Sequence, residues 1–339
     1  MANVGQTEAR PARPAADRVV LPRWLRAAGQ THGAVIALLL LVLFNAIFTT
    51  NYLAWSTLRV NLDQVATIVI VGIGMTLVIA TGGIDLSVGA LMAIAGSLAP
   101  LIFDSDWGPL DRPWVGIPLA IVLPILLTGF LGLFNGFLVT YFRIQPIIAT
   151  LVLYLGGRGI AKALSDGILL DFNNPSFEYL GKGRPLGIPV QVILMAILLL
   201  IAAWMMRSTV FGRYILATGG NEPAARLAGV PVSRVKLAVY AISGLLAGLA
   251  GLIWAARISA ADPYRAGEFM ELDAIAAAAV GGTALTGGRA TIIGTLLGAV
   301  IIQQVRFTLI SHNVSDGTTR IVIAAAIILA VLIQRQREQ

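Results

Sequence analysis

Residues 64–103 read QVATIVIVGIGMTLVIATGGIDLSVGALMAIAGSLAPLIF, and Asp85 is the one ionisable side chain among them. The run is long enough for two bilayer-spanning helices of about 20 residues each. The tripeptide Thr81-Gly82-Gly83 divides it near the middle, where glycine disfavours a continuous helix. The pattern predicts two membrane helices separated by a glycine break, with a carboxylate beside that break.

The composition of the whole chain indicates a membrane protein. Of its 339 residues, 57% are hydrophobic and only 12% are charged, with a mean hydropathy of +0.84. A soluble domain would carry about a quarter charged residues. There are no cysteines for a disulfide or a thiolate metal site, and neither histidine, His32 nor His312, lies near an acidic cluster. The sequence therefore predicts an all-α, polytopic membrane protein with no metal site.

About ten apolar segments are candidates for membrane-spanning helices, some of them short or interrupted by glycine. They are 33–49, 61–80, 86–103, 115–141, 146–164, 188–206, 236–256, 272–286, 290–311 and 319–334. These segments predict a transmembrane domain over 33–334, which includes a polar loop at 207–235. Short tails precede and follow it, at 1–32 and 335–339.

The distribution of Arg and Lys predicts the orientation of these spans. With the N-terminus in the cytoplasm, the inner segments hold fourteen basic residues: Arg10, Arg13, Arg18, Arg23, Arg26, Arg143, Arg207, Arg213, Arg226, Arg234, Lys236, Arg289, Arg335 and Arg337. The outer segments and their helix edges hold seven: Arg59, Arg112, Lys182, Arg184, Arg257, Arg265 and Arg320. Because cytoplasmic loops are enriched in basic residues, both termini are predicted to be cytoplasmic. The net charge of +7 is a topology signal and gives no support to nucleic-acid binding.

Two glycine-rich stretches resemble each other. GGIDLSVG at 82–89 is similar to GGTALTGG at 281–288, and each follows one apolar segment and precedes another. Gly82, Gly83, Gly281 and Gly282 are therefore candidate helix-break glycines. A duplicated fold with broken helices at matching positions would produce this similarity, and so would a chance match between two small-residue-rich breaks.

Three buried polar residues are candidates for a translocation path. Asp85 can cap the helix that follows it, by accepting from the backbone N–H near Ser87 or Val88, or it can meet a polyhydroxylated substrate together with Ser87. Asn135 lies beside the Gly132/Gly136 pair, where an amide most often bonds a neighbouring helix. Arg158 also lies within a span, paired internally or reaching towards the outer face, and Asp85 is one conceivable partner.

The loop segment ATGGNEPAARLAGVPVSRVK, at 217–236, contains the signals of a short helix. Asn221 can cap it, Pro223 suits its first turn, and Gly229 can end it. We expect this helix to expose Ala225 and Leu227, either for docking into a groove of a partner protein or as part of an ordinary loop surface. No P-loop motif, H-E-x-x-H or G-x-S-x-G sequence occurs, so the chain shows no ATPase or hydrolase signature of its own.

Four stretches together resemble the permease subunits of bacterial carbohydrate-uptake ABC transporters of the ribose type. They are GMTLVIATGGIDLSVGALMAIAG, NGFLVTYFRIQPIIATL, ATGGNEPAARLAGVPVSRVKLAVYAISGLLAGLAG and ELDAIAAAAVGGTALTGG. FNNPSFEYLGKG, at 172–183, adds a similarity to the galactofuranose permeases. The resemblance runs from about Asn61 to the C-terminus.

This resemblance implies a ten-helix inner-membrane permease that translocates a ribose- or galactofuranose-like monosaccharide by alternating access. Its implied partners are an ATP-binding subunit, which holds ATP and magnesium, a periplasmic sugar-binding protein, membrane lipid, and a second permease, identical or paralogous. The coupling segment that contacts the ATP-binding subunit would comprise Asn221, Glu222, Ala224, Ala225, Arg226, Leu227 and Gly229. The family motif E-x-A-A-x-x-x-G is matched by Glu222, Ala224, Ala225 and Gly229.

Two other function classes are compatible with a polytopic chain. A transporter of small polar solutes driven by an ion gradient would need ionisable groups near mid-membrane. The sequence offers few such groups, namely Asp85 and Arg158. An intramembrane enzyme would need paired carboxylates at one depth, whereas Asp85 is the only acid placed well inside a predicted span. We therefore expect no catalytic residues and no cofactor on this chain.

Overall fold

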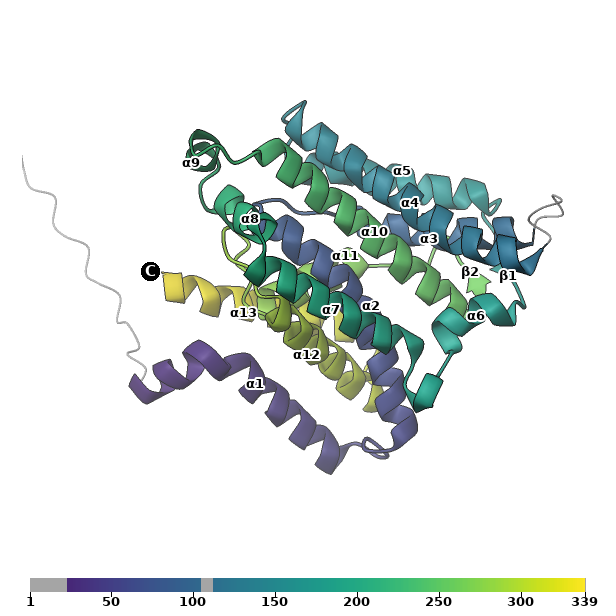
Figure 1. Cartoon of the computed structure of the whole chain (residues 1–339). Helices are drawn as coiled ribbons and strands as arrows, with labels where there is room; N and C mark the ends of the chain where they lie inside the picture. The colour runs from purple at the N-terminus through teal and green to yellow at the C-terminus, as the bar shows by residue number, and fades with distance from the viewer. Residues whose placement is uncertain (1–22, 105–111, 339) are drawn as a thin grey trace, which may run out of the picture.

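The computed structural model describes residues 23–104 and 112–338, and most of this described chain is helical (Figure 1). The predicted N-terminal tail lies outside the described residues as far as residue 22, and so does residue 339. The helices are α1 (Arg23–Phe48), α2 (Trp55–Ala80), α3 (Val88–Phe103), α4 (Pro113–Thr140), α5 (Pro146–Leu164), α6 (Pro175–Lys182), α7 (Val190–Ser208), α8 (Val210–Gly220), α9 (Glu222–Leu227), α10 (Val232–Ile258), α11 (Met270–Val280), α12 (Ile292–Ser311) and α13 (Asp316–Glu338). One 3₁₀ turn, η1 (Pro185–Gly187), precedes α7.

Each of the ten predicted segments coincides with a helix, with shifted ends at some of them. Helix α5 begins at Pro146 and ends at Leu164, as the sequence predicts. Helix α11 ends at Val280, six residues before the predicted end, because the glycine break follows directly. Helix α1 begins at Arg23, ten residues before the predicted span. The sequence does not predict the short helices α6 and α8, because neither is long or apolar enough to produce a hydropathy signal.

Six helices of the described chain are long and apolar enough to cross a membrane: α2, α4, α5, α7, α10 and α12. Two shorter apolar helices, Ala34–Phe48 and Val88–Phe103, add to these. The fold is thus that of an all-α membrane protein. Ten crossings, with both termini on the cytoplasmic side, stay predictions.

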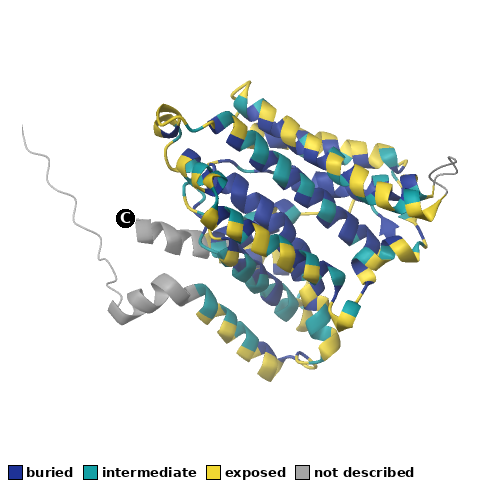
Figure 2. Cartoon of the chain, in the orientation of Figure 1, coloured by how far each residue is buried: buried dark blue, intermediate teal, exposed yellow. Residues whose placement is uncertain are grey.

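Helices α2 and α10 form the centre of the bundle. Every residue of α2 from Val65 to Ala80 is buried, as expected for a helix that is hydrophobic on all sides. Helix α10 packs against α2, α3 and α4. Buried residues therefore gather along these inner helices, whereas exposed ones lie on the outer helices (Figure 2).

The outer helices carry large apolar side chains on their exposed faces. Leu126 and Phe130 on α4 are 58% and 63% exposed, and Leu200 and Trp204 on α7 are 68% and 63% exposed. A soluble protein rarely exposes so much contiguous apolar surface. Lipid tails would cover it, so this surface agrees with the membrane class that the composition indicates.

The two ends of the bundle differ. Helices α8 and α9 lie at one end, here called the α9 end, and α6 lies at the other, the α6 end, with the short strands β1 (Leu170–Asp171) and β2 (Ala260–Ala261) (Figure 1). The two strands pair antiparallel, with Leu170 opposite Ala261. Helix α10, which is 27 residues long, connects the two ends. At a rise of about 1.5 Å per residue its length is about 40 Å. A displacement at the α9 end can therefore reach the centre of the bundle through one element.

Candidate functional site

The two predicted glycine breaks have the same backbone structure. At the end of α2, Gly82 N–H donates to Ile79 and Gly83 N–H donates to Val78. At the end of α11, the N–H groups of Gly282 and Thr283 donate in the same way to Ala279 and Ala278. Both are Schellman caps, in which a residue with positive φ follows the helix and satisfies its last carbonyls. The φ angles of Gly82 and Gly282 are 81° and 89°. A residue with a Cβ atom disfavours such values.

These two breaks also lie against each other. The Gly288 N–H donates to the Ala80 carbonyl over 3.0 Å, which joins the loop after α11 to the last residue of α2. Gly219, near the end of α8, packs against both, because a Cβ atom added there would overlap the Ala80 oxygen and lie 2.6 Å from the Gly288 nitrogen. Three chain segments thus meet backbone to backbone at the α9 end.

Asp85 is fully buried just after the first break. Its Oδ1 atom accepts from the Ser87 N–H over 3.0 Å and from the Ser87 hydroxyl over 2.6 Å. Its Oδ2 atom accepts from the Ser243 hydroxyl of α10 over 2.8 Å. The predicted bond from the Ser87 N–H is present, but Asp85 does not cap the helix: Ser87 is the N-cap residue of α3, and Asp85 lies two residues before it and holds the turn that leads into α3.

Asn135 joins the same hydrogen-bond network from α4. Its Nδ2 atom donates to the Ser87 hydroxyl over 2.9 Å, so this amide bonds a neighbouring element as the packing interpretation predicts. Asp85, Ser87 and Asn135 are therefore brought together, and all three are fully buried. Ser243 completes the network and was not identified from the sequence, because a serine among the small residues of α10 gives no separate signal. A role of these residues in translocation stays a prediction.

Arg158 does not pair with Asp85. Its guanidinium donates to the main-chain oxygens of the loop before α11, over 2.5 Å to Ala266 and 3.4 Å to Pro263 and Tyr264. The arginine thus holds that loop against α5 at the α6 end. Of the two predicted alternatives, pairing within the protein or reaching towards the outer face, these bonds support pairing within the protein.

The short helix predicted in the polar loop is α9. The Asn221 side chain accepts from the Ala224 N–H over 3.0 Å, and Pro223 lies in the first turn. At the other end, the φ angle of Gly229 is 82°, and the Val230 N–H donates to the Ala225 carbonyl over 3.0 Å. The helix is therefore capped at both ends, as its sequence predicts.

The predicted exposure of Ala225 is wrong. Leu227 is 91% exposed, whereas Ala225 is only 5% exposed. Residues two apart do not share a helix face, so the two could not both point outward. The outward face of α9 is formed by Leu227, and Ala225 packs inward.

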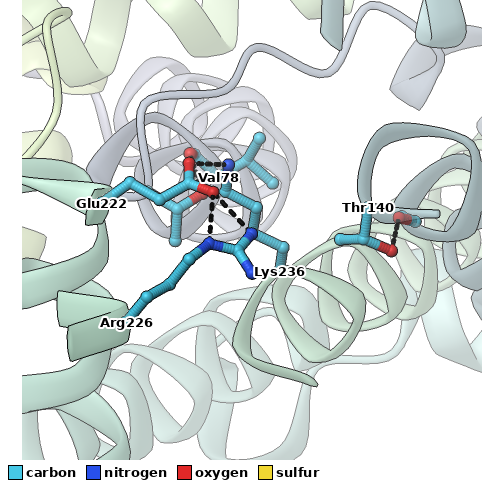
Figure 3. Close-up of polar contacts among 7 residues, drawn as sticks. Val78, Thr140, Glu222, Arg226 and Lys236 are labelled. Atoms are coloured by element: carbon cyan, nitrogen blue, oxygen red, sulfur yellow. Dashed lines mark hydrogen bonds and ion pairs between the residues drawn. The ribbon is translucent and has the colours of Figure 1, made fainter. Parts of the chain in front are cut away.

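Glu222 fixes the position of α9 relative to α10. Its carboxylate bonds Arg226 on α9 over 2.7 Å and Lys236 on α10 over 2.6 Å, and Figure 3 shows both contacts. Partial burial acts to raise the pKa of Glu222, but hydrogen bonds and charge from Lys236 and Arg226 outweigh it and hold the pKa below its ordinary value. The ionised form is thus favoured at neutral pH. Lys236 was counted in the sequence only for its charge, and the structure identifies it as the residue that connects α9 to the bundle.

Comparison with known proteins gives a consistent result over most of the chain. The model of a family described as "Branched-chain amino acid transport system / permease component" matches residues 60–332. The ribose import permease protein of Escherichia coli strain K12 is 40% identical over 309 residues, which cover 90% of this chain and 94% of that protein. The galactofuranose transporter permease protein of the same strain is 38% identical over 89% of both chains. The fructose import permease protein of Bifidobacterium longum is 34% identical over 89% of this chain and 86% of its own length. No solved structure matches.

Proposed function

The chain belongs to the family of permease components of branched-chain amino acid transport systems, and from this membership we propose that it is the permease subunit of an ABC importer for a monosaccharide. Its family is one of transport proteins and not of enzymes. The substrate class follows the similar proteins named above, which import ribose, galactofuranose or fructose. In this proposal the sugar is a pentose or hexose, and the chain lies in the bacterial inner membrane.

Transport would be driven by a separate ATP-binding subunit, which holds ATP and magnesium. A binding protein outside the membrane would deliver the sugar, and a second permease, identical or paralogous, would complete the path. Closure of the ATP-binding subunits would press on α9 and rock the two permeases against each other. The sequence carries no P-loop motif, so the proposal assigns hydrolysis to another chain.

The observation that carries this proposal is the exposure of Leu227 on a rigid helix. The leucine is 91% exposed, and this costs solvation free energy unless a partner covers it. Because α9 is capped at both ends and ion-paired to Lys236, force on Leu227 passes to α10 without melting the helix. Helix α10 in turn carries Ser243, which bonds Asp85 in the buried polar network, and it contacts α2, α3 and α4.

The proposal is tested by sugar uptake into proteoliposomes that contain the chain, its ATP-binding subunit and its binding protein. Leu227→Asp should abolish ATP-driven uptake and co-purification of the ATP-binding subunit while the chain still inserts in the membrane. Leu186→Asp is the matched control, because Leu186 is fully exposed at the α6 end. Undiminished uptake by Leu227→Asp would remove the coupling role, and uptake that needs a proton gradient but no ATP would indicate an ion-coupled transporter.

Orientation is tested separately with a single cysteine at Ser233, beside α9, in a chain that has no other cysteine. A membrane-impermeant thiol reagent should modify Ser233→Cys in inverted vesicles and leave it intact in whole cells. Modification in whole cells would place α9 outside, where no ATP-binding subunit could reach it.

A further inference from the structure

A cavity of about 260 Å³ lies at the α6 end, between helices α2, α10, α11, α12 and α13. Its position follows from the helix directions. Arg257 is in the last turn of α10, whose first turn is at the α9 end, and Gln64 is in the first half of α2, whose last residue packs on α8. Under the proposed orientation, the cavity therefore opens towards the outer face of the membrane.

Two ion pairs between aspartate and arginine side chains line the cavity. Both carboxylate oxygens of Asp273 accept from Arg306 over 2.8 Å, and Asp316 accepts from Arg320 over 2.7 Å. Four arginines and three acidic residues line the space, so their charges nearly cancel. Each pair fixes hydrogen-bond donors beside acceptors. Such a surface suits a neutral molecule with several hydroxyl groups better than it suits an anion, which would compete with the carboxylates.

Aromatic rings and a buried hydroxyl complete the lining. Trp254 and Phe269 line the cavity, and the guanidinium of Arg320 lies 4.1 Å from the centre of the Phe269 ring. Thr319 is 1% exposed, and its hydroxyl has no hydrogen-bond partner within the described part of the chain. A buried hydroxyl is normally bonded, so this atom is available to bond a ligand hydroxyl in the cavity.

We propose that this cavity binds one monosaccharide as it enters the permease, through the Asp273–Arg306 and Asp316–Arg320 pairs, the Thr319 hydroxyl and the faces of Trp254 and Phe269. Sites for drug-sized ligands begin at roughly 300 Å³. The cavity is smaller than that, which suits a single sugar ring better than a disaccharide. The inference deepens the proposed function, on which it rests for the class of substrate. It assigns a sugar-binding site within one permease chain.

The test uses thiol protection in the purified full-length chain in nanodiscs, first without partner proteins and then, in a separate arm, with the sugar-free binding protein added. Thr319→Cys places a thiol deep in the cavity and Glu268→Cys places one at its exposed rim. Thr318→Cys, on the neighbouring and exposed residue, is the matched control outside the cavity lining. Each variant is modified with a small methanethiosulfonate reagent in the presence of ribose, arabinose, galactose, fructose, sucrose or leucine.

At least one monosaccharide should slow modification of Thr319→Cys and Glu268→Cys by about fourfold at a concentration about three times its dissociation constant, because the free fraction falls by that factor. Thr318→Cys should react at an unchanged rate, and sucrose should not protect.

If no monosaccharide protects either cavity thiol, or if only leucine protects, the inference is wrong, whether or not the complete importer takes up sugar. If binding protein without sugar protects the cavity thiols and sugar does not, the cavity is a protein docking surface, which also overturns it. Protection by a monosaccharide in a chain that fails to import sugar would retain the site and overturn the proposed function.

Discussion

The ammonium group of Lys236 lies 2.6 Å from the Oε2 atom of Glu222, and this ion pair joins α9 to the beginning of α10. Arg226 bonds the other oxygen of the same carboxylate from within α9. The chain itself connects the two helices through the short turn at Gly229. The ion pair adds a second connection beside this turn, and it therefore sets the angle at which α9 presents Leu227.

Lys236→Met should uncouple ATP hydrolysis from transport without unfolding the chain. A partly exposed ion pair contributes less than about 1 kcal/mol, so thermal stability should change little. The orientation of α9 depends on the pair, so we expect more ATP hydrolysed per sugar imported. The measurement is the ratio of phosphate released to sugar accumulated in proteoliposomes. Lys182→Met is the control, because Lys182 makes a similar 2.7 Å pair with Glu178 at the α6 end; an equal effect of both changes would contradict the prediction.

The same pair predicts how the position of α9 depends on pH. Interactions with Lys236 and Arg226 hold the pKa of Glu222 below its ordinary value of 4.5. A depressed pKa means that the stabilisation is fully present above the ordinary value and is lost as the pH falls through the lowered one. Amide hydrogen exchange in α9, corrected for its intrinsic pH dependence, should therefore be constant from neutral pH to about pH 5 and increase below it. Glu222→Gln should remove this acid-induced step, and a step that persists in Glu222→Gln must come from another group.

Asp85→Asn should retain most transport activity. The amide oxygen can still accept both bonds from Ser87, and the amide nitrogen can donate to the Ser243 hydroxyl in place of the present bond. Asp85→Ala should instead leave buried donors of Ser87 and Ser243 unpaired, at a cost of about 1–3 kcal/mol for each such group. Thermal unfolding in detergent and uptake assays measure the two effects. An Asp85→Asn chain of normal abundance and stability that transports nothing would indicate that the negative charge itself is required.

The sequence predicts the helices of this protein better than their contacts. Hydropathy locates each long helix, and Gly82, Gly229 and Gly282 predict where helices end, because both signals are local. The Asp85–Ser243 and Asp273–Arg306 bonds join residues that are 158 and 33 positions apart, and no local pattern indicates that these side chains meet. They depend on how the helices pack.

The error at Ala225 has a different origin. The short helix itself was predicted correctly, but the prediction that Ala225 lies on its exposed face was not. The helix has only 6 residues, and so few positions do not define an apolar periodicity. The burial of Ala225 follows from the packing of α9 on the bundle. The ion pair with Lys236 fixes that packing, and this pairing could not be chosen from among the many basic residues of the loop.

Gly219→Ala should disrupt the contact between α8 and the two glycine breaks. A Cβ atom at Gly219 would overlap the Ala80 oxygen and lie 2.6 Å from the Gly288 nitrogen, and backbone atoms cannot rotate away as a side chain could. Overpacking of this kind costs about 1–3 kcal/mol, so the midpoint of thermal unfolding should fall by several degrees. Gly220→Ala is a close control, because the nearest atom to its added Cβ is 3.9 Å away, and alanine is the better helix former. If both variants unfold at the wild-type temperature, the three segments are not packed this closely; if both are destabilised equally, the effect belongs to α8 itself and not to its contact with the breaks.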